Sequence, residues 1–380
     1  MKYEKLKDVA EFINGLAFKP SDWKKKGKKI IRIQNLTDPE KPFNRTTKNV
    51  DKKYIVKTND IMFSWSASLG IFIWNEKEDA VLNQHIFKVI PIDQNKIHKK
   101  YLVYCLRLVI DSIQNHLHGS TMKHINRGDL LDVKIPVPEL SKQIKIGSSL
   151  DKIEKLSNKR KEILLKIDQS ILSVFLDYFG DPLDKKQKFP IKKLNEIGKL
   201  ERGISKHRPR NDPVLLDGPY PLIQTGDVSN SDKIINNFSK TYSEVGLKQS
   251  KLWPKGTLCI TIAANIARTG VLGIDACFPD SIVGFTTNEK STIEYVRVWL
   301  MFFQKKLEEE APKSAQKNIN LEILKNLEIQ LPPLNMQKKF HEISEKIYSI
   351  KQKQIISLNK TEGLLKKVLS DNIKMEAFYG

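Results

Sequence analysis

The chain has 380 residues with a hydrophobic content of 40%, and lysine plus arginine outnumber aspartate plus glutamate by 65 to 44. Its length exceeds that of one ordinary core and predicts two to three domains. It has no run of 18 apolar residues, and Cys105, Cys259 and Cys277 lie far apart without a CxxC pair. Composition therefore argues against a membrane span and a disulfide scaffold, and it predicts a reducing, cytoplasmic location. The formal net charge of +21 indicates a polyanionic partner, with nucleic acid as the first candidate.

The first 140 residues predict a domain of mixed strands and helices. Short β-like runs broken by Gly, Asn and Pro come first, namely KKIIRI, KYIVK, DIMFSW and LGIFIW. A helix over 99–117 follows them. Pro138 then prevents any helix from passing through that point.

A long helix is expected after this proline, over about 141–179. Its apolar residues recur at alternating steps of three and four, as in a coiled-coil seam, with interruptions at Ser157 and Arg160. The predicted seam consists of Ile146, Leu150, Ile153, Leu164, Ile167, Ile171 and Val174. Gly180 and Pro182 end the helix and begin a linker.

The second half repeats this order of elements. The β-like runs TLCITIAA, TGVLGI and SIVGF precede a helix over 294–310, and Pro332 and Pro333 precede a second long helix over about 335–371. This second seam consists of Phe340, Ile347, Leu358, Leu365 and Val368. It is weaker than the first, because Ser344 and Thr361 occupy seam positions and Lys351 and Gln354 interrupt it.

One segment occurs twice in the sequence. STMKHINRGDLLDVKIPVPELSKQ from Ser120 and SAQKNINLEILKNLEIQLPPLNMQ from Ser314 are identical at nine of 24 positions without a gap, and every identical pair is 194 residues apart. KLKDV at Lys5 and KLNEI at Lys193 are 188 residues apart, so the second copy has gained about six residues in its interior. Because insertions gather in loops, the repeat predicts two units that share a scaffold and differ in their recognition surfaces.

This layout resembles the specificity subunit of type I restriction–modification enzymes, over essentially the whole chain. The domain openings KLKDVAEFINGLAFKPSDW and KKLNEIGKLERGIS and the two IN…L…I…P.L..Q endings carry the resemblance. It implies an α+β fold in which two mixed α/β target recognition domains, in a pseudo-two-fold arrangement, are joined by two long antiparallel helices that form a coiled coil. The expected divisions are recognition domains at 1–140 and 191–334, spacer helices at 141–180 and 335–375, a linker at 181–190 and a tail at 376–380.

The resemblance also implies a function. Each recognition domain would read one half of a split, asymmetric target in double-stranded DNA. A helix of about 36 residues spans ~54 Å, against about 34–36 Å for one turn of B-DNA, so the helices would set the separation of the half-sites. Two methyltransferase (M) subunits would bind the helices, and restriction (R) subunits would join through them. S-adenosylmethionine, ATP and Mg are then expected on the partner subunits, with no membrane involved and no catalysis by this chain.

Charge and amide chemistry predict the DNA-contacting residues, since cations bind phosphates while amides and arginines read base edges. The basic candidates are Lys24, Lys25, Lys26, Lys28 and Lys29 in the first domain and Arg202, Lys206, His207, Arg208 and Arg210 in the second. The base-reading candidates are Gln34, Asn35, Asn83, Gln84, His85, Gln224, Asn265 and Arg268. Lys123 and Lys317, shared by both copies, are expected to hold phosphate or the scaffold. The alternatives are a merely solvated lysine loop, amides that satisfy backbone groups in turns, and a core position for Trp65.

The sequence contains no recognisable catalytic motif. The only double proline, in LPPL, does not match the [DNS]-P-P-[YFW] motif of adenine methyltransferases, and neither a Walker A loop nor a spaced histidine ligand set occurs. A basic structural tether for RNA or a membrane, without DNA sequence specificity, is the main alternative function. The recognition half of a larger fused polypeptide is another. Divergence between the two domains favours the bipartite reader, because a tether does not require it.

Overall fold

The computed structural model describes residues 2–38, 40–66, 68–116, 127–182, 184, 188–263, 266–310 and 319–374. They form two compact units. Unit 1 comprises Met1–Lys161 with Ile356–Gly380, and unit 2 comprises Glu162–Ile355. Each unit therefore contains a head of mixed strands and helices together with one half of each long helix. We call residues 2–139 the first head and residues 190–333 the second head.

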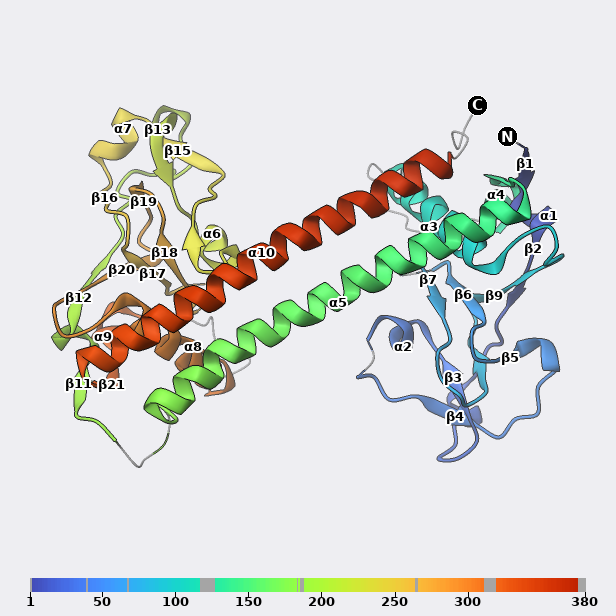
Figure 1. The fold of residues 1–380 in the computed structure, drawn as a ribbon, viewed down its shortest axis with the longest axis horizontal. Helices are drawn as coiled ribbons and strands as arrows, with labels where there is room; N and C mark the ends of the chain where they lie inside the picture. The colour runs from blue at the N-terminus through green and yellow to red at the C-terminus, as the bar shows by residue number, and fades with distance from the viewer. Residues whose placement is uncertain are drawn as a thin grey trace. The chain divides into compact units, whose positions relative to one another are not determined.

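The first head is built from two four-stranded sheets and a two-stranded ribbon (Figure 1). One sheet has the order β2-β9-β6-β7, the other has the order β4-β3-β8-β5, and β1 pairs with β10. All pairings are antiparallel except β3 with β8. The strands are β1 (Tyr3–Lys5), β2 (Ala10–Asn14), β3 (Lys28–Ile31), β4 (Asn44–Thr46), β5 (Ile55–Val56), β6 (Ile61–Ser64), β7 (Gly70–Ile73), β8 (Ala80–Leu82), β9 (Ile86–Pro91) and β10 (Lys134–Pro136).

The second head repeats this topology strand for strand and adds β14. Its sheets have the orders β12-β20-β17-β18-β14 and β15-β13-β19-β16, and β11 pairs with β21. The parallel pair β13–β19 corresponds to β3–β8. The strands are β11 (Ile191–Lys193), β12 (Gly198–Arg202), β13 (Leu216–Leu222), β14 (Ile234–Ile235), β15 (Lys240–Tyr242), β16 (Leu252–Trp253), β17 (Leu258–Thr261), β18 (Thr269–Leu272), β19 (Ala276–Cys277), β20 (Ile282–Thr287) and β21 (Glu328–Gln330).

The helices follow the same duplication. Helix α3 (Lys99–His116) of the first head corresponds to α8 (Ile293–Glu310) of the second, and α4 (Arg127–Asp132) corresponds to α9 (Leu321–Lys325). The remaining short helices are α1 (Leu6–Val9), α2 (Ile33–Thr37), α6 (Thr225–Asn230) and α7 (Glu244–Lys248). Among the described residues, no helix combines the length and the apolar content that a membrane span requires.

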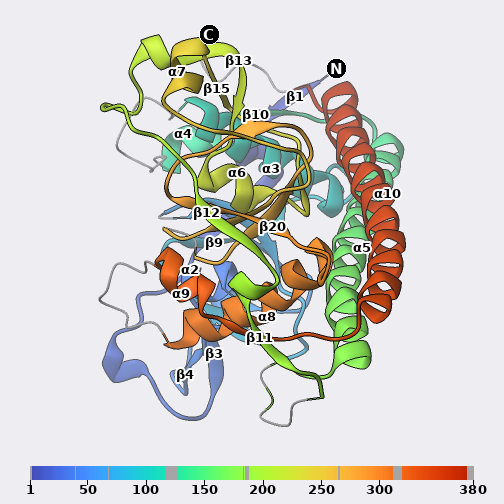
Figure 2. The ribbon, with the colours of Figure 1, turned by 90° about the vertical axis from the view of Figure 1, so that its left-hand side faces the viewer.

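The two long helices predicted from the heptads are confirmed as α5 (Leu140–Phe179) and α10 (Leu334–Asn372). Within each unit their halves run antiparallel and lie side by side (Figures 1 and 2). In unit 1, Glu362 of α10 accepts from Ser157 at 3.5 Å and pairs with Lys161 at 2.8 Å. In unit 2, Phe340 of α10 packs on Phe175 of α5, with ring centroids 5.5 Å apart.

Every predicted seam position is buried or half-buried, so the heptad positions lie on the buried face of each long helix. The buried members are Ile146, Leu150, Ile171 and Phe340, and the half-buried members are Ile153, Leu164, Ile167, Val174, Ile347, Leu358, Leu365 and Val368. The polar interruptions are also covered. Lys351 pairs with Asp168 of α5 and with Asp232, and Thr361 donates to the Ser357 carbonyl oxygen at 2.8 Å.

The repeated segment fixes the start of each long helix to the head before it. Gln143, fully buried, accepts from the backbone N–H of His98 at 2.8 Å and donates to the carbonyl oxygens of Lys96 and Pro138. Its counterpart Gln337 accepts from the N–H of Thr292 at 3.0 Å and donates to the carbonyl oxygens of Lys290 and Pro332. All four pairs of equivalent residues are 194 apart. The duplication therefore repeats a junction between head and helix, because a buried amide must satisfy all its hydrogen-bonding groups.

Each head shares one apolar core with the helix halves beside it. In unit 1 the core joins α3 to Ile146 and Leu150 of α5 and extends to Ile373, just after α10. Tyr3 also donates its hydroxyl to the Lys374 carbonyl oxygen at 3.0 Å. In unit 2 the core joins α8 to Phe175 and Phe179 of α5 and Phe340 of α10. Each head is consequently held by both long helices.

Candidate nucleic-acid interface

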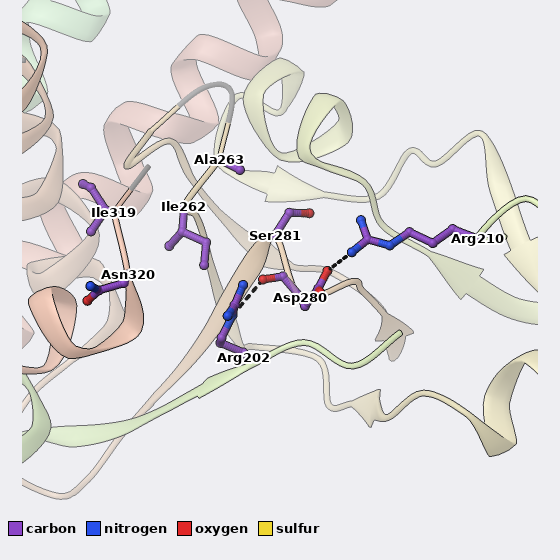
Figure 3. A pocket seen from close by; sticks show the side chains of 8 residues that line it. All are labelled: Arg202, Arg210, Ile262, Ala263, Asp280, Ser281, Ile319 and Asn320. Atoms are coloured by element: carbon purple, nitrogen blue, oxygen red, sulfur yellow. Dashed lines mark hydrogen bonds and ion pairs between the residues drawn. The ribbon is translucent and has the colours of Figure 1, made fainter. Parts of the chain in front are cut away.

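The second head contains a cleft of about 310 Å³ beside the end of β12 (Figure 3). Its lining comes from four places in the sequence, which the antiparallel pairing of β12, β20 and β17 brings together. The lining residues are Arg202, Arg210, Ile262, Ala263, Asp280, Ser281, Ile319 and Asn320. A cleft lined by both aliphatic side chains and arginines offers an apolar surface for a base and donors for phosphate or a base edge.

Asp280 holds three of the predicted arginines at this cleft. Arg202 donates through Nε to the Asp280 carbonyl oxygen at 2.9 Å, and Arg210 pairs with the Asp280 carboxylate at 2.5 Å (Figure 3). Arg208 lies 3.8 Å from the other carboxylate oxygen. All three arginines are exposed. The Asp280 carboxylate faces two guanidinium groups, and the third, that of Arg202, contacts the backbone of the same residue. Three arginines and one carboxylate leave the cluster a net positive charge of two, suited to a polyanion.

The loop that carries this cluster is held in place by polar contacts. Gln249 accepts through Oε1 from the backbone N–H groups of Lys206 and His207 at 2.7 and 3.1 Å. The His207 ring lies 2.8 Å from Asp212, and this hydrogen bond lowers the pKa of the Asp212 carboxyl. The exposed Lys206 side chain stays on the surface. His207 therefore anchors the loop, while the neighbouring cations face solvent.

Two further candidates of the second head, Gln224 and Arg268, are not among the residues that line the cleft. Gln224 precedes α6 as its N-cap, and its backbone N–H donates to Asp227 at 2.8 Å. Arg268 is exposed at the turn between β17 and β18. Asn265, like Lys123 and Lys317, lies outside the described residues. Asn320, which is shared by both copies of the repeat, does line the cleft, and it caps α9 by accepting from Ile323 N–H at 2.8 Å.

The lysine loop of the first head borders a second cleft, of about 330 Å³. Its lining residues are Gly27, Lys28, Thr46, Thr47, Lys48, Glu78 and Asp79. Lys24, Lys25, Lys26 and Lys28 are exposed. Lys29 instead pairs with Glu76 and lies 3.6 Å from Glu78. Four of the five predicted lysines therefore present their charge to solvent.

Gly27 interrupts this lysine loop for a steric reason. Its φ is +107°, and a Cβ there would lie 2.2 Å from the Thr46 carbonyl oxygen. A lysine at this position would clash with β4, so the run of cations has to break. Glycine thus allows the loop to approach the sheet edge.

The aromatic rings next to these cations were not among the residues predicted from the sequence. Trp23 is 38% exposed, and the Arg32 guanidinium lies 5.5 Å from its ring centroid. Lys48 lies 5.9 Å from the Phe18 ring. Exposed aromatic rings among cations are surfaces on which nucleic-acid bases stack. The available signal was the position of Trp23 directly before the lysine run.

The amide candidates of the first head divide into structural and exposed residues. Asn35 is buried, and its amide bonds to the backbone of Arg32, Lys41 and Pro42. Gln34 belongs to the same short helix, α2. Asn83 accepts from Phe18 N–H at 3.4 Å. Asn35 consequently uses its polar groups to hold the loop after α2.

Gln84 and His85 form the turn between β8 and β9. Gln84 is exposed, whereas His85 has a φ of +70° and its ring lies 5.1 Å from that of Trp65. Trp65 is half-buried, stacks on Phe87 at 5.6 Å and donates to Asn14 at 3.4 Å. Trp65 and His85 therefore pack against the first sheet, and Gln84 presents its amide outward.

Among the residues that the structure describes, neither head contains a group of three His, Cys, Asp or Glu side chains that could hold a metal ion. The three cysteines are buried and free. Burial raises the pKa of the Cys105 thiol to about 12, which keeps it protonated at neutral pH.

Comparison with known proteins finds the same two-part organisation. A family model described as the type I restriction modification DNA specificity domain matches residues 1–168 and again residues 186–360. The chain is 25% identical over 376 residues to the type I restriction enzyme EcoBI specificity subunit of Escherichia coli, covering 89% of this chain and 77% of that protein. It is 24% identical over 357 residues to a putative type I restriction enzyme MjaX specificity subunit of Methanocaldococcus jannaschii, covering 88% and 83%.

Two solved structures share the fold. One is the S subunit of a type I restriction–modification system from M. genitalium, with a TM-score of 0.62, 13% identity and coverage of 98% of this chain and 96% of that one. The other comes from work on complex assembly and conformational transition of the type I R-M system, with a TM-score of 0.56, 16% identity and coverage of 98% and 97%. The predicted fold class, of mixed domains joined by paired long helices, is confirmed.

Proposed function

The chain belongs to the type I restriction modification DNA specificity family, and on that premise we propose that it reads an asymmetric, bipartite DNA target with one head for each half-site. The observation that carries this proposal is the contrast between two heads of one topology. The second head presents arginines around Asp280, whereas the first presents lysines beside the exposed ring of Trp23. Two unlike surfaces on one scaffold support recognition of two unlike half-sites.

We further propose that the long helices carry the partner subunits: two M subunits bound to the helices and R subunits joined through them. The helices expose large apolar side chains that the heads and the seam leave uncovered. These are Ile144, Leu156, Leu165 and Leu176 on α5 and Ile350, Ile356 and Leu364 on α10. Exposed apolar residues on a regular element support a protein-binding role. The chain itself would be cytoplasmic and would perform no catalysis. S-adenosylmethionine, ATP and Mg would be bound by the partners.

Exchange of one head tests this function. Residues 1–139 are replaced by the corresponding head of a relative that reads another sequence, and methylated adenines are mapped in cells that express the hybrid with its partners. One half of the methylated sequence should change while the other stays the same. Cells with the chain but without the partners serve as the control and should show no methylation.

Two outcomes of this exchange would contradict the proposal. A change in both halves, or in neither, would show that the heads do not read separately. Sequence-independent binding to RNA or to lipid vesicles, with no methylation pattern, would favour the tether.

Asp280 offers a test of the arginine cleft. Asp280→Asn removes the one carboxylate that faces Arg208 and Arg210, so both can bind phosphates. Affinity for a random-sequence duplex should rise several-fold, and the slope of log K against log salt should steepen by about 1. Fluorescence anisotropy at several salt concentrations measures both quantities.

The control is Glu289→Gln, which makes the same charge change at an exposed residue in the turn before α8. Equal effects of the two variants would show that the cleft has no special part.

A further inference from the structure

The two heads rest on different side chains of the long helices. The first docking face, in unit 1, consists of Ile146 and Leu150 of α5 with Leu369 of α10 and Ile373 just after it. The second docking face, in unit 2, consists of Phe340 and Ser344 of α10 with Phe175 and Phe179 of α5. The positions correspond one to one, because Ile146 and Phe340, Leu150 and Ser344, Phe175 and Leu369, and Phe179 and Ile373 are each 194 residues apart.

The faces differ first in side-chain volume. Two phenylalanines on the second face, Phe175 and Phe179, pack on Tyr295 of α8 with ring centroids 5.5 and 4.9 Å away. The third, Phe340, packs on both of them. The corresponding positions on the first face hold isoleucine and leucine. The equivalent tyrosine, Tyr101, keeps its hydrogen bond to the Pro136 carbonyl oxygen at 2.9 Å, as Tyr295 does to Gln330. The two tyrosines therefore make the same hydrogen bond to the backbone, whereas the side chains packed around them differ in volume.

The faces differ also in buried polarity. Ser344 is 1% exposed and donates its hydroxyl to Glu294 of α8, a carboxylate that is 2% exposed. On the first face the serine position holds Leu150, and the glutamate position holds Lys100, which pairs with Asp151.

Gly147 also lets α3 approach α5, because a Cβ there would lie 3.2 Å from Lys100 Cβ. The corresponding position in unit 2 is His341.

We propose that each docking face accepts only its own head, so that the heads cannot exchange places within this chain. The second head on the first face would leave space where three phenyl rings belong and would place its buried glutamate against a leucine. The first head on the second face would be overpacked by the same rings. The faces thus select which head can be accommodated at each of the two positions on the long helices.

A chain with two copies of the second head tests this selection. Residues 1–139 are replaced by residues 190–333, and thermal unfolding is followed by circular dichroism and calorimetry. The transition of unit 1 should fall by about 10 °C or more, because several buried groups lose volume or partners. Ile146→Phe, Leu150→Ser, Leu369→Phe and Ile373→Phe together should recover at least half of that loss. The same four substitutions in the parent chain should lower its transition instead.

Matched substitutions on the exposed sides of the same helix halves provide the control. Ile144→Phe, Leu156→Ser, Leu364→Phe and Ile356→Phe repeat the chemistry at residues that are 44–54% exposed. They should neither rescue the duplicated chain nor destabilise the parent by more than about 2 °C. A duplicated chain as stable as the parent would overturn the proposal. So would a rescue no larger than that from the exposed set.

Discussion

Replacing Glu294 with glutamine is expected to lower the free energy of unfolding of unit 2 by about 3–5 kcal/mol. The carboxylate is 2% exposed and accepts from Arg297 at 2.9 and 2.8 Å, while Lys233 lies 3.1 Å away. Arg297 is itself 4% exposed, so the variant leaves a buried guanidinium without its counter-charge. Urea denaturation of the full chain, followed by tryptophan fluorescence and circular dichroism, measures the change.

The control is Glu322→Gln, which removes a carboxylate from the same unit at the surface. Glu322 pairs with Lys325 at 2.8 Å and its side chain is 71% exposed, so little stability should be lost. Equal losses for the two variants would show that the buried cluster contributes nothing beyond a surface pair.

The pH dependence gives this prediction a second readout. Burial alone would raise the pKa of Glu294, but Arg297, Lys233 and Ser344 lower it from 4.5 to about 2. A lowered pKa means that the unfolded chain binds the proton first, so this stabilisation is complete above about pH 4.5 and is lost as pH falls through about 2. The difference in stability between the parent and Glu294→Gln should therefore shrink between pH 5 and pH 2. A constant difference would contradict the assigned ionisation.

Phe175→Ala should cost unit 2 about 3–5 kcal/mol through the cavity that it leaves. Phe175 is fully buried, and its ring lies within 5.5 Å of the rings of Phe179, Tyr295, Phe302 and Phe340. It joins α5 to the second head and to α10 at one point. Because the head depends on this contact, its near-ultraviolet circular dichroism should be lost at lower urea concentration.

The neighbouring residue supplies a matched control for this cavity. Leu176 is 38% exposed on the same helical turn, and Leu176→Ala should cost about 1 kcal/mol or less. A Phe175→Ala variant with the same midpoint as Leu176→Ala would mean that the aromatic cluster does not hold α5 to the head.

The long helices could be predicted almost to the residue because their signals are local. Heptad spacing marks the hidden face, Pro138 and Pro333 exclude a helix before them, and Gly180 follows the end of α5. The α3 and α8 helices were predicted for the same reason. Periodicity and chain-breaking residues require no knowledge of distant partners, so these elements can be derived from the sequence.

The polar seam positions show where that reasoning stops. In the sequence, Ser344 and Thr361 suggest a weak second seam. The neighbouring residues do not show whether a polar residue at a seam position weakens the helix pair or has a hydrogen-bond partner elsewhere in the fold. In the folded chain Ser344 donates to Glu294, 50 residues earlier, and Thr361 donates to its own helix. A serine that looks unfavourable in a heptad is therefore required by a carboxylate in another element.

The arginine cleft was partly predictable. The basic cluster from Arg202 to Arg210 is visible as a run of charge, but Asp280 lies 70 residues beyond Arg210 and carries no local signal. Asn35 was chosen for its amide chemistry, and only the fold places that amide against the carbonyl oxygens of Lys41 and Pro42. Residue type predicts what a side chain is able to bind, whereas tertiary structure decides whether its groups are already used.

The placement of Ile373 in the core of unit 1 has a consequence for biosynthesis. Unit 2 is continuous in sequence, whereas unit 1 needs residues 356–373 to cover Ile146 and Leu150. Translation at 5–20 residues per second inserts roughly 10–40 s between the two parts of unit 1. The earlier part of unit 1 is therefore synthesised well before the part that completes it, and its apolar face stays uncovered until residues 356–373 have been made.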